Sequence, residues 1–239
     1  MPVQSQTRPA AENRGPNAVD AVLFDFGGTL DADGLPWRER IARCCRDEGV
    51  VIDPGVFDAT FYAADDALVG VVPPTLSLRE TVTRLVSGLA RGLRLGSDAP
   101  IDRVTACFVD KAQRTLDRNR ALLTALGQRY RLGLVSNFYG NLAAICEESR
   151  IHQLFGVIID SADVGLTKPD PRIFLKATDA LGVSPSAAVF VGDSLPRDMA
   201  GARAAGMPHI WLSGNGRDGV CCPGDPVIHS LAALKEILL

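Results

Sequence analysis

Residues 21–30, Ala-Val-Leu-Phe-Asp-Phe-Gly-Gly-Thr-Leu, join a short apolar run to an acidic residue and two glycines. The run Ala21–Phe24 is apolar at every position, which is typical of a strand buried on both faces of a parallel sheet. Asp25 follows it directly, and Gly27 and Gly28 allow the chain to turn sharply and to approach a ligand closely. Because ligands bind beyond the carboxyl ends of the strands in an open parallel sheet, Asp25 is a candidate functional residue.

The same pattern, an apolar run followed by a polar residue, returns in the second half of the chain. The runs cover 132–135, 156–159 and 187–191, and they end at Ser136, at Asp160 and at Gly192–Asp193. A further candidate strand covers 209–212. Segments typical of helices cover 142–149, 171–181, 196–205 and 230–239. Strands that alternate with helices predict βαβ units, and therefore an α/β fold with a parallel sheet.

Residues 35–119 show helical periodicity without buried strand-like runs. The candidate helices cover 37–48, 54–68, 78–93 and 101–116. This predicts a helical domain, residues 35–119, inserted into a core domain made of residues 19–34 and 120–239. Residues 1–18 are rich in Pro, Gln, Asn, Ala and Arg without periodicity, and we expect them to be a disordered leader.

Composition excludes several classes of protein. The chain has 239 residues, enough to bury a core without disulfides or a structural metal. With 25 Lys and Arg against 28 Asp and Glu, it lacks the basic balance of a nucleic-acid-binding protein. No stretch approaches the roughly 20 apolar residues of a membrane span, so we expect no membrane partner. The six cysteines lack zinc-site spacing, which favours free thiols and a cytoplasmic location.

Three further motifs accompany the first. They are Leu134-Val135-Ser136-Asn137, then Lys168-Pro169-Asp170-Pro171, then Val191-Gly192-Asp193-Ser194 followed by Asp198. In this order and at this spacing, the four motifs resemble those of the haloacid dehalogenase (HAD) superfamily. The resemblance covers residues 20–239, and residues 35–119 resemble the helical C1 cap of subfamily I. It implies a Rossmann-like parallel sheet core, the HAD fold, with an inserted helical cap.

The resemblance also implies a Mg²⁺-dependent phosphatase. In such enzymes the carboxylate at the position of Asp25 attacks phosphorus and forms an aspartyl-phosphate, which splits the hydrolysis into two easier steps. The carboxylates of Asp25, Asp193 and Asp198 would hold Mg²⁺, together with the backbone carbonyl of Gly27. Mg²⁺ prefers such oxygen ligands and bridges carboxylate to phosphoryl oxygen.

Further residues would bind the phosphoryl group of the substrate. The resemblance gives Lys168 the pairing with phosphoryl oxygens and Ser136 a hydrogen bond to them. Gly28, Thr29 and Asn137 are the remaining phosphate-binding candidates. We expect the substrate to be a small phosphorylated metabolite, and the protein to be a monomer or a homodimer.

One residue departs from the family pattern. Phosphatases of the family resemble Asp-x-Asp-Gly-Thr at the first motif, and Gly27 stands where the second Asp serves as general acid/base. Gly27 keeps a carbonyl for the metal but has no carboxylate. We therefore expect a metal site and slow catalysis, since acid–base help is worth about 10²–10⁴-fold. Asp31 and Asp33 follow closely and are candidates for a substitute acid.

Three alternatives stay open. A catalytically impaired family member could bind phosphate or a partner without turnover, and the change at Gly27 motivates this reading. A 2-haloacid dehalogenase is disfavoured, because those enzymes need no metal whereas Asp193 and Asp198 are both present. Phosphonoacetaldehyde hydrolases use a lysine early in the cap, whereas Lys111, the single lysine of residues 35–119, lies near their end.

Overall fold

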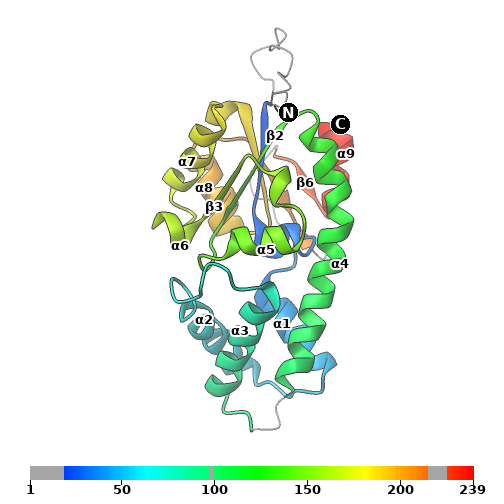
Figure 1. The fold of residues 1–239 in the computed structure, drawn as a ribbon, viewed down its shortest axis with the longest axis vertical. Coiled ribbons are helices and arrows are strands. Elements are labelled where there is room, and N and C mark those ends of the chain that lie inside the picture. The colour runs from blue at the N-terminus through cyan, green and yellow to red at the C-terminus, as the bar shows by residue number, and fades with distance from the viewer. Residues whose placement is uncertain (1–18, 97–99, 215–224) are drawn as a thin grey trace, which may run out of the picture.

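The computed structural model describes residues 19–96, 100–214 and 225–239. Figure 1 shows an elongated molecule with an α/β core at one end and a group of helices at the other. The predicted leader, residues 1–18, lies outside the described residues, as does the cysteine pair Cys221 and Cys222. Within the described ranges, no helix is both long enough and apolar enough to cross a bilayer.

Within the described residues, the core contains a six-stranded parallel sheet with the order β3-β2-β1-β4-β5-β6. The strands are β1 (Ala21–Phe24), β2 (Arg131–Ser136), β3 (Val157–Asp160), β4 (Ala188–Gly192), β5 (His209–Leu212) and β6 (Val227–Ile228). β1 pairs with both β2 and β4, so Asp25 emerges between the ends of its two neighbours. The α/β fold and the parallel sheet predicted from the sequence are confirmed. β6 was not predicted, because two residues are too short to carry a pattern.

Helices cover both faces of this sheet. They are α5 (Leu142–Glu148), α6 (Ser161–Val164), α7 (Pro171–Leu181), α8 (Ala200–Ala204) and α9 (Leu234–Leu238), with the short helical turns η1 (Phe26–Leu30), η2 (His152–Leu154), η3 (Pro185–Ala187), η4 (Leu195–Met199) and η6 (Leu231–Ala233). Side chains alternate along β1: Ala21 and Leu23 belong to the cluster that includes Phe174 of α7, and Val22 and Phe24 to the cluster on the other face.

The helical region contains α1 (Trp37–Asp47), α2 (Pro54–Asp66), α3 (Leu78–Gly92) and the first part of α4 (Ile101–Gly127). In Figure 1, α4 runs from this region along the whole core. The helix expected to stop at 116 continues because Leu122, Leu123 and Leu126 are buried. The predicted domain boundary between 119 and 120 therefore falls inside one continuous helix, and the division into domains stays a prediction.

Asp160, an acid at a strand end, supports backbone. Its carboxylate accepts hydrogen bonds from the N–H groups of Gly140 (2.8 Å), Leu142 (3.1 Å) and Ala162 (3.0 Å). These bonds fix the starts of α5 and α6, and they hold the loop that follows Ser136. Asp160 therefore supports the backbone that follows Ser136 and does not act in the site itself.

We expect Asp160→Ala to lower the free energy of unfolding by at least about 2 kcal/mol, because it leaves three buried or partly buried N–H donors without their acceptor. Urea unfolding of the variant and of the wild-type protein measures the difference. The control is Asp163→Ala, at an exposed acid of the adjoining helix α6, with an expected change below about 1 kcal/mol. Equal losses in both variants would contradict the anchoring role of Asp160.

Candidate active site

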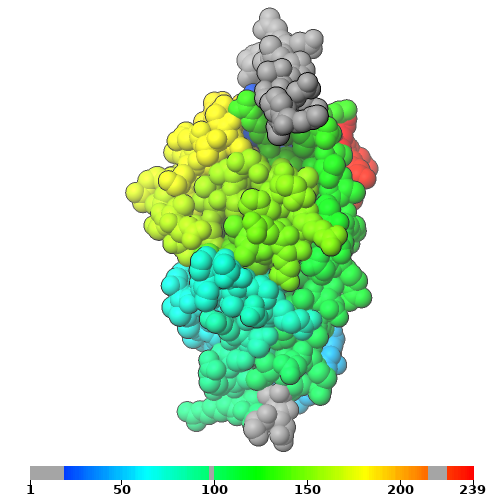
Figure 2. Space-filling model, viewed as in Figure 1, coloured from blue at the N-terminus to red at the C-terminus, as the bar shows by residue number. Residues whose placement is uncertain are grey.

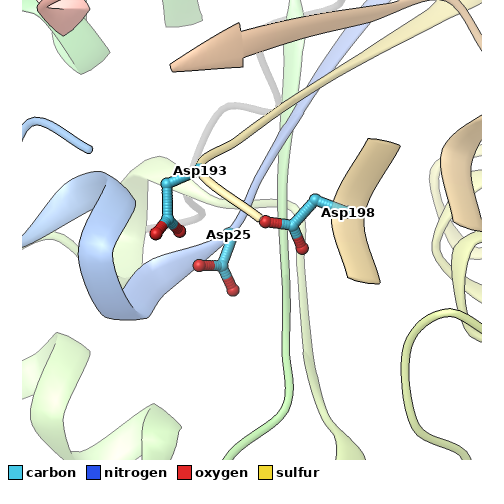
Figure 3. Close-up of side chains that lie close together, drawn as sticks. All are labelled: Asp25, Asp193 and Asp198. Carbon is cyan, nitrogen blue, oxygen red and sulfur yellow. The ribbon is translucent and has the colours of Figure 1, made fainter. Parts of the chain in front are cut away.

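Three carboxylates converge at the carboxyl ends of β1 and β4 (Figure 3). One oxygen from each of Asp25, Asp193 and Asp198 lies within 4.8 Å of the others. Asp25 and Asp198 are buried, and Asp193 is half-buried. Chain segments separated by more than 160 residues supply these acids, and the parallel pairing of β1 with β4 brings them together. We call these three side chains the carboxylate cluster.

Lys168 is buried beside this cluster. Its Nζ donates to Asp25 Oδ1 (2.6 Å) and to Asp198 Oδ1 (2.6 Å). Burial alone would lower the pKa of Lys168, but Asp198 and Asp25 together outweigh burial and raise it. The ammonium group is therefore charged at neutral pH. The cluster therefore holds more acidic groups than the single charge of Lys168 can balance.

The pKa shifts of the acids have the same origin. Burial raises the pKa of Asp193 well above its usual range, and the charges of Asp25 and Asp198 raise it further. Burial also raises the pKa of Asp198, although Lys168 acts in the opposite direction. A divalent cation would offset the repulsion that these shifts reflect. Three carboxylates form the all-oxygen donor set that Mg²⁺ prefers, so the residues present fit this ion.

Two hydroxyl groups contact the cluster. Ser136 Oγ donates to Asp25 Oδ1 (2.9 Å), the same oxygen that Lys168 holds. Thr29 Oγ1 lies 3.2 Å from Asp193 Oδ1 and 3.4 Å from Asp25 Oδ2. The structure thus brings both predicted hydroxyls to the nucleophile candidate. Their predicted contacts with phosphate stay predictions.

Asn137 and Gly28 act on the segments around the cluster. Asn137 Nδ2 donates to the carbonyl of Lys168 (3.1 Å), and Lys168 N–H donates to Asn137 Oδ1 (2.8 Å). The amide side chain therefore holds the backbone that carries the lysine. Gly28 has φ of +95°, and a Cβ there would lie 2.7 Å from Asp193 Oδ2. Its N–H donates to Asp31 Oδ1 (2.7 Å), so Gly28 positions the loop and lets Asp193 approach.

We call α1, α2, α3 and the first part of α4 the cap. The carboxylate cluster opens into a cavity of about 90 Å³ that core and cap residues line together. Figure 2 shows the segment around α2 and α3, in cyan, packed directly against the core. Core residues at the cavity include Asp25, Gly27, Ser136, Asn137, Lys168, Asp193, Arg197 and Asp198, and cap residues include Trp37, Arg38, Phe61, Tyr62 and Asp65. A water-sized probe needs roughly 10–15 Å³, so the cavity has room for a small ligand.

The sequence profile described as haloacid dehalogenase-like hydrolase matches residues 19–206. The chain belongs to this family. It is similar to a phosphatase of Mycobacterium tuberculosis, MT3486, with 32% identity over 231 residues, which cover 92% of this chain and 97% of the relative. The chain is therefore a HAD-like hydrolase, as the sequence predicted.

Two solved structures show the same fold. The magnesium-bound putative HAD-hydrolase YfnB of Bacillus subtilis has a TM-score of 0.55 and 21% identity, over 92% of this chain and 99% of that one. A dehalogenase has a TM-score of 0.63 and 19% identity, over 93% of this chain and 98% of that one. At such identities, these likenesses concern the fold alone.

In this HAD-like hydrolase, the indole ring of Trp37 lies close to the position that a side chain on Gly27 would occupy. A Cβ on Gly27 would lie 3.3 Å from Trp37 Nε1. That nitrogen donates to Asp31 Oδ2 (2.7 Å), and the ring packs edge-on against Phe108 and Phe138, at centroid distances of 4.8 and 5.6 Å. Trp37 is therefore fixed, and Gly27 fits beneath it.

The two proposed substitute acids have partners elsewhere. Asp31 is buried, accepts from Trp37, and forms an ion pair with Arg40 (2.5 Å). Asp33 pairs with the exposed Arg118. Neither acid is among the residues that line the cavity. The structure therefore does not bring Asp31 or Asp33 to the place where a leaving group would be protonated.

Sequence reasoning missed several cavity residues, among them Asp65, Tyr139 and Arg197. Tyr139 Oη donates to Asp65 Oδ1. Burial raises the pKa of Asp65, although this hydrogen bond lowers it. Tyr139 lies three residues after Ser136, so the strand-end rule could have found it. Asp65 belongs to no motif, and no sequence pattern around it indicates that the end of α2 lies at the same cavity as Asp25.

We expect Mg²⁺ to raise the melting temperature, because a ligand that binds only the folded state stabilises it. At a concentration a hundredfold above the dissociation constant, the gain is about 2.7 kcal/mol. Thermal unfolding with and without Mg²⁺ measures this gain. Asp193→Asn should lose most of the shift, while Asp163→Asn, at an exposed acid outside the cluster, should keep it. A shift that survives in Asp193→Asn would sink the proposed metal site.

We expect Gly27→Ala to lower the free energy of unfolding by about 1–3 kcal/mol, because its methyl group presses on the fixed Trp37 ring. The backbone itself is not strained, since φ at Gly27 is −75°. The control is Gly127→Ala, where the new Cβ would meet Leu132 Cδ1 at an ordinary 3.7 Å. Denaturant unfolding compares the two variants. An unchanged free energy of unfolding in Gly27→Ala would show that the Trp37 ring can move aside without cost.

Proposed function

We propose that this HAD-like hydrolase is a Mg²⁺-dependent phosphatase that hydrolyses a small phosphomonoester through an aspartyl-phosphate at Asp25. The observation that carries the proposal is the position of Asp25. It lies in an all-oxygen carboxylate cluster, at the wall of a cavity, with Lys168 and Ser136 on one of its oxygens. The similarity to the phosphatase MT3486 supports the reaction class.

The chain's own residues would orient and stabilise the first step. Lys168 and Ser136 hold Asp25 Oδ1. The orientation of the carboxylate is therefore fixed before the substrate binds, and its other oxygen can face the phosphorus atom. When Asp25 becomes esterified it loses its negative charge, and the two donors can turn to the phosphoryl oxygens. Thr29 keeps Asp25 and Asp193 together from the side of η1.

Mg²⁺ would be held by the carboxylates of Asp25, Asp193 and Asp198, with the carbonyl of Gly27 as a further ligand. Its charge would polarise a phosphoryl oxygen and offset the repulsion between phosphate and carboxylates. Asp198 is positioned for this task by the N–H of Ser194, which donates to its Oδ2 (2.9 Å).

Gly27 cannot protonate the leaving oxygen, because it has no side chain. We therefore propose that, without a proton donor elsewhere in the cavity, turnover is slow for poor leaving groups and fastest for activated esters, which need little protonation. The alternative of a protein that binds without turnover predicts a Mg²⁺ effect on stability but no phosphate release. The dehalogenase reading is less favoured, since the acid-rich cluster with one lysine suits a metal.

The substrate that we propose is a small phosphorylated metabolite, in keeping with a cavity of about 90 Å³. A cytoplasmic location, a monomeric or homodimeric state and the lack of nucleic-acid and membrane partners remain our expectations from the sequence.

We expect Mg²⁺-dependent phosphate release from 4-nitrophenyl phosphate, and we expect Asp25→Asn to reduce it by at least about 10³-fold, because the amide is not a nucleophile. Colorimetric phosphate release with and without a chelator is the measurement. Asp163→Asn is the matched control and should keep the wild-type rate. Full activity in Asp25→Asn would refute the nucleophile, and no release by the wild-type protein would favour the binding-only alternative.

A further inference from the structure

A general acid for this site has to come from the wall of the cavity, because Gly27 supplies none. Asp25 and Asp198 share Lys168, and Asp193 lies with them in the carboxylate cluster that would hold the metal. Asp31 and Asp33 do not line the cavity, and they form ion pairs with Arg40 and Arg118. Among the described residues that line the cavity, Asp65 is the remaining carboxylate.

We infer that Asp65 of the cap is the general acid/base of this hydrolase and replaces the carboxylate that is missing at Gly27. The inference rests on the proposed phosphatase function and deepens it. It assigns the acid to a helix of the cap, whereas the nucleophile Asp25 belongs to the core.

One carboxyl oxygen of Asp65 accepts a hydrogen bond from the protein, and the other can carry the proton that an acid catalyst donates. Asp65 lies in the last turn of α2, is half-buried, and lines the same cavity as Asp25 and Gly27. Tyr139 Oη donates to Asp65 Oδ1, and no described residue donates to Oδ2. Tyr139 is buried in the loop that Asp160 fixes, so it acts as a positioning residue for the carboxyl group.

The charges around Asp65 come from several elements. Burial has the largest effect and raises the pKa of Asp65, and Asp66 on the same helix raises it further. The Tyr139 hydrogen bond and Arg197 of η4 lower it without cancelling the rise. Arg38 of α1, Lys168 and the carboxylate cluster complete the charged wall of the cavity. The carboxyl group thus keeps its proton to higher pH than an ordinary Asp, as an acid catalyst requires.

The proton balance closes over the two half-reactions. As Asp25 attacks phosphorus, the bond from phosphorus to the leaving oxygen breaks, and protonated Asp65 gives its proton to that oxygen. An alcohol leaves, and Asp65 is now a carboxylate. It then takes a proton from water while the water oxygen attacks phosphorus and the bond to Asp25 breaks. Phosphate leaves, and both side chains return to their starting forms.

The test compares two leaving groups in Asp65→Asn, whose amide oxygen can still accept from Tyr139. Rapid-quench measurement follows phosphorylation of Asp25 by glycerol phosphate, a poor leaving group, and by 2,4-dinitrophenyl phosphate, an activated one. We expect a loss of about 10²–10⁴-fold with glycerol phosphate, because the proton donor is gone. With the activated ester, we expect a change within about threefold, since its leaving oxygen needs no proton.

Two further variants separate chemistry from structure. Asp163→Asn, at an exposed acid that does not line the cavity, should keep wild-type rates with both esters. Tyr139→Phe removes a hydrogen bond that lowers the pKa of Asp65. The loss of activity at high pH with glycerol phosphate should therefore move to higher pH in this variant, which a purely structural role of Tyr139 would not cause.

The outcomes separate this inference from the proposed function. Equal losses on both esters in Asp65→Asn would overturn the acid role in favour of substrate binding or structure. Unchanged phosphorylation by glycerol phosphate would overturn it in favour of another donor. In either case, Mg²⁺- and Asp25-dependent hydrolysis of the activated ester would leave the proposed phosphatase standing, and its absence in the wild-type protein would overturn both.

Discussion

The ammonium group of Lys168 between Asp25 and Asp198 is the interaction on which the site depends. A lone buried lysine would be uncharged or excluded from the interior, and two buried carboxylates without it would repel each other. Together they satisfy one another at 2.6 Å, and Asn137 fixes the backbone that carries the lysine. Removal of either partner would leave a buried charge unpaired, which is far more costly than the net gain from the pair.

Much of the core could be predicted from local patterns. The continuous apolar runs reveal strands that are buried on both faces, and the rule for strand ends then brings Asp25, Ser136 and Asp193 to one edge. Asp160 satisfies the same local rule and yet caps two helices, because its strand β3 lies two places from β1 in the sheet. Position along the sheet, which the sequence pattern does not report, decides which strand-end acids meet.

The cap wall of the site could not be predicted in the same way. Trp37 looks like an ordinary core residue of an amphipathic helix, and its position over Gly27 depends on packing against Phe108, more than 70 residues away. Asp65 has no motif around it, and its environment comes from a tyrosine of the core. Such contacts depend on how the cap helices pack against the loops at the carboxyl ends of the core strands. For this reason a missing carboxylate can be read from the sequence, whereas its replacement needs the structure.

The continuous helix α4 limits how this enzyme can admit its substrate. A cap joined to its core by two loose strands of chain can swing away as a rigid body. Here one of the two connections is a helix with an unbroken ladder of hydrogen bonds, and Asn119 ties it to the carbonyl of Leu30 in the other connection (2.9 Å). Opening therefore has to bend a helix or strain its end. Such a joint favours small excursions of the cap, so the preference for small substrates that we propose would be set in part by the backbone.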